Sequence, residues 1–323
     1  MVLELRPMFR ILLFIIFFLA TMTGPIPVAH AFWIWTPETG KFINPKNAVK
    51  DTPPEQLDFA KGFYEAKNYS QAITELRKLI KFYPKSKEAP EAQYYLGRSF
   101  EALNNFFEAY KAYQVIVDKY PFSERSAEIV ERQYKIGESL LDGKYKGKWA
   151  EFFSSDYDVI EVFRQVIKNA PYGKYASVAQ YKIGLYLKEK SLLQDARDEF
   201  EKTINDYPDS EWAKAAKYQI ALVDSKRSSD SQHDQKVTQV ARQEFQDFID
   251  NHPDSELSQK AKDQIKDLRN KEAENNFVVA QFYEKQKNYK AAKIYYDLIA
   301  SDYADTPVVN KALQRSQTLG VIK

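Results

Sequence analysis

The amino-acid sequence predicts an all-α solenoid of about six antiparallel helix pairs, with a long first helix in the last pair. A block of similar sequence recurs along the chain, at residues 60–84, 97–121, 184–208 and 280–304. Apolar residues in each block fall three or four positions apart, which is the spacing of one face of a helix. Three of the blocks end in proline, which cannot continue a helix and therefore ends it.

Small residues recur at matching positions of these blocks. Each block opens with glycine or alanine and carries a central alanine, namely Ala72, Ala109, Ala196 and Ala292. Small side chains let two antiparallel helices, A and B, approach closely, and bulky residues between these positions fill the seam. Because several positions recur together, the blocks match the tetratricopeptide repeat (TPR) pattern.

Two further copies of the pattern carry insertions between their helices. The first insertion, Leu141 to Phe153, contains glycines and aromatic residues and predicts an ordered loop packed on the helices. The second, Ser225 to Gln235, is polar and predicts a mobile segment. The predicted solenoid spans residues 55–323, and its helix pairs occupy residues 55–84, 88–121, 124–171, 174–208, 211–253 and 256–304.

Two local signals describe the end of the solenoid. The stretch from Glu256 to Lys285 contains neither proline nor glycine. It therefore predicts one helix of roughly 45 Å, at about 1.5 Å per residue. Residues 307–319 predict a closing helix.

The N-terminal residues 1–31 have the pattern of a secretory signal peptide. Arg6 and Arg10 precede an apolar run, and Ala29 to Ala31 form a small-x-small cleavage site. The run is shorter than the roughly 20 apolar residues that span a bilayer, which favours cleavage over anchoring. Residues 32–54 contain four prolines and predict an extended lead-in.

Composition argues against several classes of function. The formal net charge of +2 gives no strong field for nucleic acid, and the absence of cysteine excludes disulfides, thiolate chemistry and lipid attachment through cysteine. No metalloprotease, phosphate-loop or nucleophile-elbow motif occurs. His252 takes the place of the tyrosine that precedes the closing proline in other blocks, which predicts a packing role. We therefore expect a protein that is not an enzyme and has no cofactor and no metal.

Helix A of each repeat is expected to line the concave face of the solenoid. Tyr94, Tyr134 and Tyr181 occupy the same position in three successive repeats. One interpretation is a groove for an extended or helical peptide. The other is that these tyrosines only support packing between repeats. The candidate groove residues are Tyr64, Tyr94, Arg98, Glu101, Tyr134, Glu138, Tyr181 and Lys188.

Residues 55–306 resemble the BamD (YfiO-like) family of outer-membrane β-barrel assembly factors. The resemblance is carried by the opening repeat NYSQAITELRKLIKFYP, the insertion in the third repeat, the long helix, and the motifs at Val279 to Ala292 and Tyr303 to Thr306. Two features depart from the family. The lipid-bearing cysteine of the lipobox is missing, and about six hairpins replace the usual five. Residues 32–35 (FWIW) are aromatic enough to act as an interfacial foot instead.

The resemblance implies a non-catalytic periplasmic scaffold of the outer-membrane protein assembly machinery. Its partners would be a barrel assembly protein with periplasmic domains, docked on the C-terminal repeats, and unfolded outer-membrane client peptides, received by the N-terminal repeats. It would lie at the inner face of the outer membrane, with peripheral membrane association. The alternative is a soluble periplasmic TPR adaptor for cell-envelope or peptidoglycan enzymes, which would not track with that membrane.

Overall fold

The computed structural model describes residues 34–36, 41–43, 48–121, 123–142, 156–230 and 235–320. The chain forms two compact units, residues 1–89 and 90–323. The described residues are almost entirely helical and form successive antiparallel pairs, which confirms the predicted all-α, TPR-like fold class. The predicted signal peptide lies outside the described residues. None of the described helices combines the length and the hydropathy of a membrane span.

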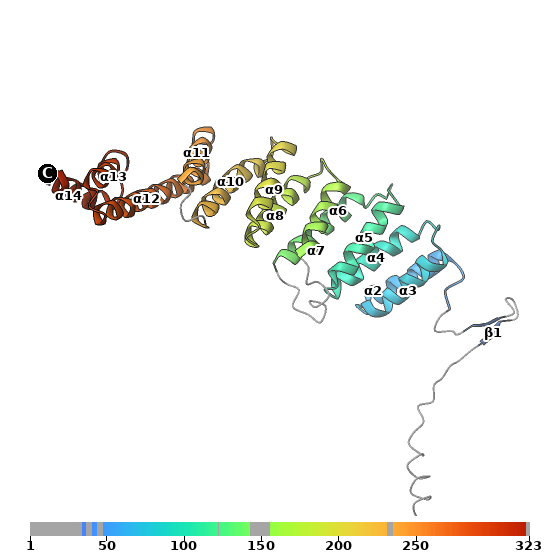
Figure 1. The fold of residues 1–323 in the computed structure, drawn as a ribbon. Coiled ribbons are helices and arrows are strands. Elements are labelled where there is room, and N and C mark those ends of the chain that lie inside the picture. The colour runs from blue at the N-terminus through green and yellow to red at the C-terminus, as the bar shows by residue number, and fades with distance from the viewer. Residues whose placement is uncertain are drawn as a thin grey trace, which may run out of the picture. The chain divides into compact units, whose positions relative to one another are not determined.

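The first unit contains a short strand pair and one helical hairpin (Figure 1). Strands β1 (Ile34–Thr36) and β2 (Lys41–Ile43) pair antiparallel, and the hairpin consists of α2 (Pro53–Glu65) and α3 (Tyr69–Phe82). The lead-in therefore contains a strand pair that the sequence did not predict. Two such short strands are stabilised by few residues, so periodicity gives them little signal.

The end of the lead-in is bound to this hairpin. The Tyr83 hydroxyl donates to the carbonyl oxygens of Lys50 and Asp51, at 2.7 and 3.1 Å. The Gln56 side chain accepts from the Lys50 amide and donates to the Glu75 carboxylate. These bonds fix the point at which the chain enters the first repeat.

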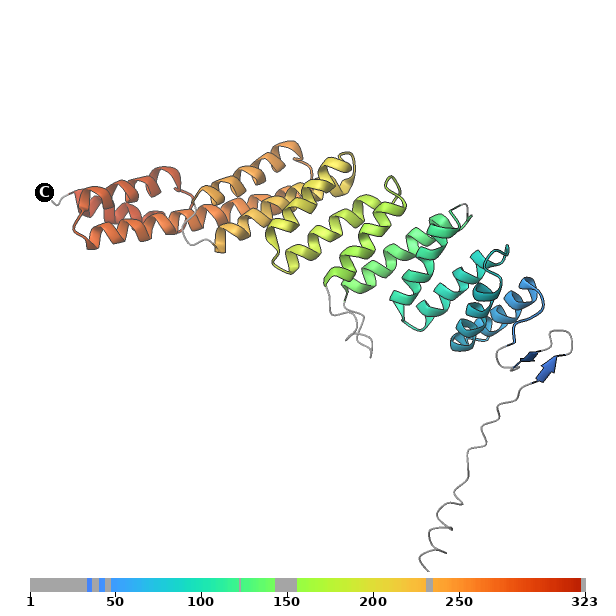
Figure 2. The ribbon, with the colours of Figure 1, turned by 45° about the vertical axis from the view of Figure 1, so that its right-hand side comes forward.

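The second unit is a row of five helix pairs with a single closing helix (Figures 1 and 2). Helix α4 begins at the last residue of the first unit. The bounds are α4 (Ala89–Ala102), α5 (Phe106–Lys119), α6 (Ser126–Leu141), α7 (Asp156–Asn169), α8 (Ala176–Glu189), α9 (Leu193–Asp206), α10 (Glu211–Asp230), α11 (Gln235–Asn251), α12 (Glu256–Lys285), α13 (Tyr289–Asp302) and α14 (Val309–Gly320).

The tight turn between helices A and B is the same in the four repeats without insertions. A non-glycine residue adopts a left-handed backbone there, at Lys67, Asn104, Ser191 and Lys287, with φ between 56° and 61°. Three of the following residues are asparagines whose side chains cap helix B, whereas Leu192 lacks this side-chain bond. An asparagine cap satisfies an otherwise unpaired amide at the helix N-terminus.

Helices A and B pack through the small residues at the seam. A Cβ placed on Gly184 would lie 2.6 Å from the Phe200 ring, and one on Gly137 would lie 2.8 Å from the Phe163 ring. Gly97 faces the Tyr113 ring in the same way. These rings are fully buried. Glycine is therefore required where the ring of helix B occupies the space that a side chain on helix A would need.

The predicted long helix is confirmed as α12, a helix of 30 residues. Its N-terminal half supplies Ala261 and Leu268 to a core with Tyr218 and Phe245. Its C-terminal half supplies Ala273 and Ala280 to another core with α13 and α14. One helix therefore links two hydrophobic cores, and the predicted closing helix is present as α14.

The two insertions have different outcomes. The prediction of a mobile segment from Ser225 to Gln235 is wrong for residues 225–230, because α10 continues through them to Asp230. Polar residues such as serine, lysine and arginine are tolerated on a helix whose preceding turns are packed. Most of the first insertion, residues 143–153, lies outside the described residues.

Replacing Pro121 by alanine should change the free energy of unfolding by less than about 0.5 kcal/mol. Helix α5 ends at Lys119, the Tyr120 amide already bonds to the Ile116 carbonyl, and Pro121 is exposed. Tyr120 already has a non-helical backbone, with φ −132° and ψ 57°, so the helix has ended before the proline. Urea unfolding followed by circular dichroism would measure the change, and a loss of more than about 1 kcal/mol would show that the proline itself sets the turn.

Candidate functional site

The three stacked tyrosines of the predicted groove are buried in the second unit. Tyr94, Tyr134 and Tyr181 are only 4%, 7% and 7% exposed. Each ring contacts the seam aromatic of its own helix B, with ring centres 5.6 to 6.3 Å apart. The rings therefore belong to the core in this structure.

Residues from the following hairpin cover the other side of these rings. The Arg125 guanidinium lies 4.2 Å from the centre of the Tyr94 ring, and Tyr175 stacks on Tyr134 with ring centres 4.7 Å apart. Trp212 lies 5.2 Å from Tyr181. Each covering residue comes four positions after the proline that closes the preceding repeat. The tyrosine position thus joins successive hairpins.

The tyrosine hydroxyls lie among polar side chains of the A helices. Tyr94 donates to Glu128 at 2.6 Å and accepts from Arg98 at 2.9 Å, and Arg132 bonds to both Glu128 and Glu101. Burial alone would raise the pKa of the Glu128 carboxyl, but hydrogen bonds from Tyr94 and Arg132 outweigh it and lower the pKa. Arg98 and Glu101 therefore form part of one ionic network with Tyr94.

The other predicted groove residues lie in smaller polar clusters. Tyr134 donates to Glu138 at 2.9 Å, and Lys182 forms an ion pair with Glu138. Lys188 donates to Gln219, which in turn donates to the Tyr181 hydroxyl. Burial and the nearby Lys226 lower the pKa of Lys188.

Tyr64 lies in the first unit, where its ring meets Tyr69 edge-on with ring centres 5.5 Å apart. The remaining groove residues lie in the second unit. The structure brings Tyr94, Arg98 and Glu101 together, and it pairs Tyr134 with Glu138. The helix-A face offers charged and hydroxyl groups rather than open aromatic rings.

Sequence reasoning missed Arg132 and Glu128, which complete the network around Tyr94. They form an ion pair four residues apart on α6. That spacing is itself a signal of a helical ion pair. Neither residue is among the candidate groove residues, and their proximity to α4 depends on the packing of two hairpins.

Replacing Tyr94 by phenylalanine is expected to lower the free energy of unfolding by about 1–2 kcal/mol, because it removes bonds to charged groups while keeping the packed ring. Tyr181→Phe is the matched control. Its hydroxyl accepts one bond from the neutral Gln219 side chain, so we expect a loss of about 0.5–1 kcal/mol. Urea unfolding compares the two, and equal losses would argue against a strong network at Tyr94.

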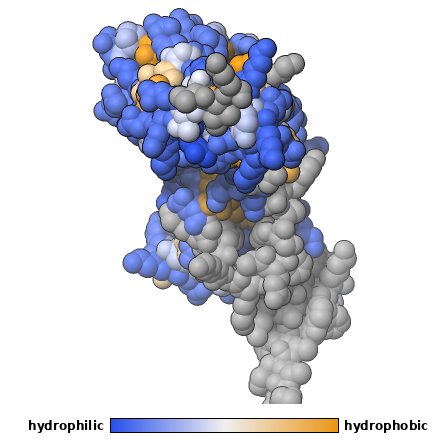
Figure 3. Space-filling model, turned by 60° about the vertical axis from the view of Figure 1, so that its left-hand side comes forward, coloured by the Kyte–Doolittle hydropathy of each residue, from blue (hydrophilic) through white to orange (hydrophobic). Residues whose placement is uncertain are grey.

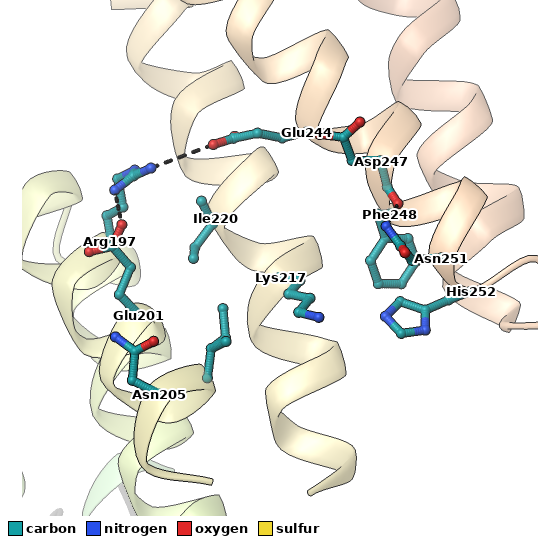
Figure 4. A pocket seen from close by; sticks show the side chains of 11 residues that line it. Arg197, Glu201, Asn205, Lys217, Ile220, Glu244, Asp247, Phe248, Asn251 and His252 are labelled. Carbon is teal, nitrogen blue, oxygen red and sulfur yellow. Dashed lines mark hydrogen bonds and ion pairs between the residues drawn. The ribbon is translucent and has the colours of Figure 1, made fainter. Parts of the chain in front are cut away.

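A second candidate site is a pocket of about 610 Å³ that is lined by residues of α9, α10 and α11 (Figure 4). Arg197, Glu201 and Glu244 lie near one end and His252 near the other. No residue of the predicted groove lines it. It would escape sequence analysis because its walls come from three successive helices whose lining residues are far apart in the sequence.

Arg197 holds carboxylates from three successive helices at this pocket. Its guanidinium bonds to Asp224 at 3.1 Å and pairs with Glu244 at 3.5 Å and with Glu201. Arg227 also bonds to Asp224. Burial and the neighbouring Asp224 carboxyl raise the pKa of Glu244 to about 7. Glu244 is thus a carboxyl that holds a proton near neutral pH.

We expect stability to depend on pH through Glu244. Its folded pKa of about 7 lies above the ordinary value of 4.5, so the folded state binds the proton more tightly. The linked contribution is fully present below pH 4.5 and is lost as pH rises towards 7. Thermal melts should therefore show Glu244→Gln flattening the decline of the wild-type melting temperature over this range. An unchanged pH profile would mean that Glu244 titrates normally.

The described residues contain no group of three or more His, Asp or Glu side chains arranged to hold a metal ion. His252 packs on Phe248, with ring centres 5.1 Å apart. Its Nε2 atom is buried and has no hydrogen-bond partner in the described part of the chain. The packing role predicted for this histidine fits that contact, and its free nitrogen faces the pocket described above.

Comparison with known families finds two matches. Residues 171–319 match the family model described as YfiO, outer membrane lipoprotein. Residues 57–86 and 91–123 match a tetratricopeptide repeat model. The first match begins just before α8 and extends into α14, and the second covers the hairpins α2–α3 and α4–α5. No match was found among curated proteins.

Solved TPR structures resemble the chain only distantly. The C-terminal part of a TPR repeat-containing protein from Cytophaga hutchinsonii is 16% identical, with 82% of this chain and 88% of that chain covered and a TM-score of 0.37. A tetratricopeptide repeat protein from Parabacteroides merdae is 13% identical, with coverages of 82% and 98% and a TM-score of 0.33. YrrB, described as a TPR protein with an unusual peptide-binding site, is 15% identical, with coverages of 68% and 94% and a TM-score of 0.34.

These similarities are too weak to carry a functional argument. The repeat matches and the helix pairs themselves identify the fold. The family match covers less than half of the chain, in its C-terminal part. The chain is therefore a TPR protein whose C-terminal part is similar to the YfiO outer-membrane lipoproteins.

Proposed function

We propose that this protein is a non-catalytic periplasmic scaffold of the outer-membrane protein assembly machinery. It binds a barrel assembly partner with periplasmic domains and unfolded client segments, at the inner face of the outer membrane. The match of residues 171–319 to the YfiO outer membrane lipoproteins carries this proposal. The matched residues include the long helix α12, which is also one of the features on which the sequence resemblance to this family rests.

The C-terminal hairpin, formed by α12 and α13, supports partner docking because it exposes large apolar side chains. Val278 and Phe282 are 63% and 57% exposed and lie one helical turn apart on α12. Ile294 on α13 is also exposed. The face seen in Figure 3 is mostly hydrophilic, with small separate hydrophobic patches. Contiguous exposed apolar surface typically marks protein interaction sites, and Val278 and Phe282 are the pair that we propose for this contact.

The helix-A face supports client binding through polar groups. Arg98, Glu101, Glu138 and Lys188 lie on successive A helices of the second unit and are partly exposed. Charged and hydroxyl groups of this kind can bond to the backbone of an extended peptide. The tyrosine rings would act by holding these helices in register.

Attachment to the membrane is proposed to occur through the partner. The sequence has no cysteine to carry a lipid. Trp35 is half exposed and would add a weak interfacial contact. Docking through the C-terminal hairpin would therefore be the main tether.

The test is affinity purification of the tagged protein from envelope fractions, with mass spectrometry of the proteins recovered. We expect a large outer-membrane barrel protein with periplasmic domains. Recovery should fall sharply for the double variant Val278→Ser, Phe282→Ser. The control is Leu192→Ser, because Leu192 is an exposed apolar residue of the second unit that lies outside α12 and α13.

Recovery of soluble or peptidoglycan enzymes alone would contradict the assembly role and favour the adaptor. Equal recovery of the barrel protein by the double variant and the control would place docking elsewhere. Client binding is tested separately, by fluorescence anisotropy with labelled segments of an unfolded outer-membrane barrel protein.

A further inference from the structure

The pocket between α9 and α11 has the length of a short peptide segment. Glu244 and His252 mark its two ends and lie eight residues apart along α11 and its C-terminus. At about 1.5 Å per helical residue they are separated by roughly 12 Å. An extended peptide rises about 3.3 Å per residue, so three or four residues span this distance.

The floor of the pocket is apolar. Ile220 from α10 and Phe248 from α11 are almost fully buried beneath it, and Ile204 from α9 adds to the same surface. The rest of the lining is polar or charged, and besides the residues at the two ends it includes Asn205, Asn251, Lys217 and Asp247. Ligand sites combine apolar surface with polar groups that fix the orientation of the ligand.

The end near Arg197 has more carboxylates than cations. Arg197 and Arg227 face three carboxyl groups, those of Glu201, Asp224 and Glu244. Asp224 is only 5% exposed, so water screens this cluster poorly. The Glu244 Oε2 atom is buried and receives no hydrogen bond from a donor among the described residues.

A proton currently relieves this excess of negative charge. Arg197 and Glu201 face Glu244 from α9, and Asp224 faces it from α10. Burial and Asp224 together raise the pKa of Glu244 to about 7, so near neutral pH the carboxyl is partly protonated. A positively charged group entering the pocket would take over the role of that proton.

We propose that this pocket binds a short extended peptide segment, with a lysine or arginine side chain against Glu244 and a neighbouring apolar side chain on Ile220 and Phe248. The charge excess selects the basic residue, and the buried floor selects the apolar one. The asparagines of the lining can bond to the peptide backbone. This site is separate from the helix-A face and does not depend on the assembly role.

Binding is linked to release of the Glu244 proton. A basic side chain pairs with the ionised carboxylate, so affinity rises as pH increases through about 7. Between pH 6 and pH 8 the ionised fraction of such a group changes by about tenfold, and the affinity should change by a similar factor. The gain with pH distinguishes this site from purely apolar binding.

The experiment is isothermal titration calorimetry of the purified protein with four blocked tetrapeptides. Two carry adjacent leucine and lysine in either order between glycines, and two carry glutamine in place of lysine. We expect at least one lysine peptide to bind about tenfold more tightly than its glutamine partner at pH 8. Titrations in buffers of different ionisation enthalpy should show about half a proton released per bound peptide at pH 7, because about half of the Glu244 carboxyls are protonated there.

Glu244→Gln should abolish both the preference for lysine and the pH dependence. Asp250→Asn is the matched control, because it removes the same charge from α11 outside the pocket and should bind as the wild type does. Thermal melts check that both variants fold. Equal binding of lysine and glutamine peptides, unchanged binding by Glu244→Gln, or no binding by either lysine peptide would overturn the proposal.

Discussion

Replacing Arg197 by methionine should lower the free energy of unfolding by about 3 kcal/mol. Arg197 bonds to Asp224 and pairs with Glu244 and Glu201, so one side chain neutralises carboxylates from α9, α10 and α11. Methionine keeps much of the packing of the arginine stem but leaves the buried Asp224 with Arg227 alone. Equilibrium urea unfolding, followed by circular dichroism, measures the loss.

Lys135→Met is the control for Arg197→Met. Lys135 and Glu131 form an ion pair one turn apart on α6, and both side chains are exposed. Removing such a surface pair should leave the urea unfolding midpoint almost unchanged, because water and salt screen the two charges. Adding Glu244→Gln to Arg197→Met should change the loss little, because without Arg197 the Glu244 carboxyl keeps its proton and carries no charge near neutral pH. Similar losses for Arg197→Met and Lys135→Met would contradict the view that Arg197 links three helices.

The substitution Gly184→Ala should lower the free energy of unfolding by about 1–3 kcal/mol. The new Cβ atom would lie 2.6 Å from the Phe200 ring, which is fully buried and cannot swing away. Alanine normally stabilises the interior of a helix relative to glycine by roughly 1 kcal/mol. The predicted sign therefore tests the seam, because helix propensity alone gives the opposite result.

Gly62→Ala provides the matched comparison. Gly62 also lies within a helix A, in α2, but no atom comes within 4 Å of a Cβ placed there. We expect this variant to be stabilised by about 0.5–1 kcal/mol. In the Phe200→Leu background, Gly184→Ala should cost less stability than it does in the wild type, because the smaller leucine leaves room for the new Cβ atom. Stabilisation by both glycine replacements would show that the seam adjusts freely.

Local patterns were sufficient to predict most helices of the second unit. Apolar spacing, the closing prolines and the absence of helix breakers from Glu256 to Lys285 all act within a few turns of one helix. The same local view failed at residues 225–230. Their polar composition resembles a linker, but they continue a helix whose earlier turns pack through Tyr218 and Ala221.

The candidate groove could be predicted only in part. The recurrence of Tyr94, Tyr134 and Tyr181 is visible in the sequence, and so is the proximity of Arg98 and Glu101 on one helix. The groups that cover the rings are Arg125, Tyr175 and Trp212. They share a position relative to the closing proline but differ in chemistry, so a search for similar residues does not find them.

The sequence by itself determined that the chain is a TPR-like all-α array whose last pair begins with a long helix, α12, because helix periodicity and helix ends are local properties. Only the tertiary structure decided that the tyrosine rings are buried between hairpins and that Arg197, Asp224 and Glu244 meet beside a pocket. Those contacts join residues on three helices. Their energies depend on burial and on the distances between charges, which arise only when the hairpins pack.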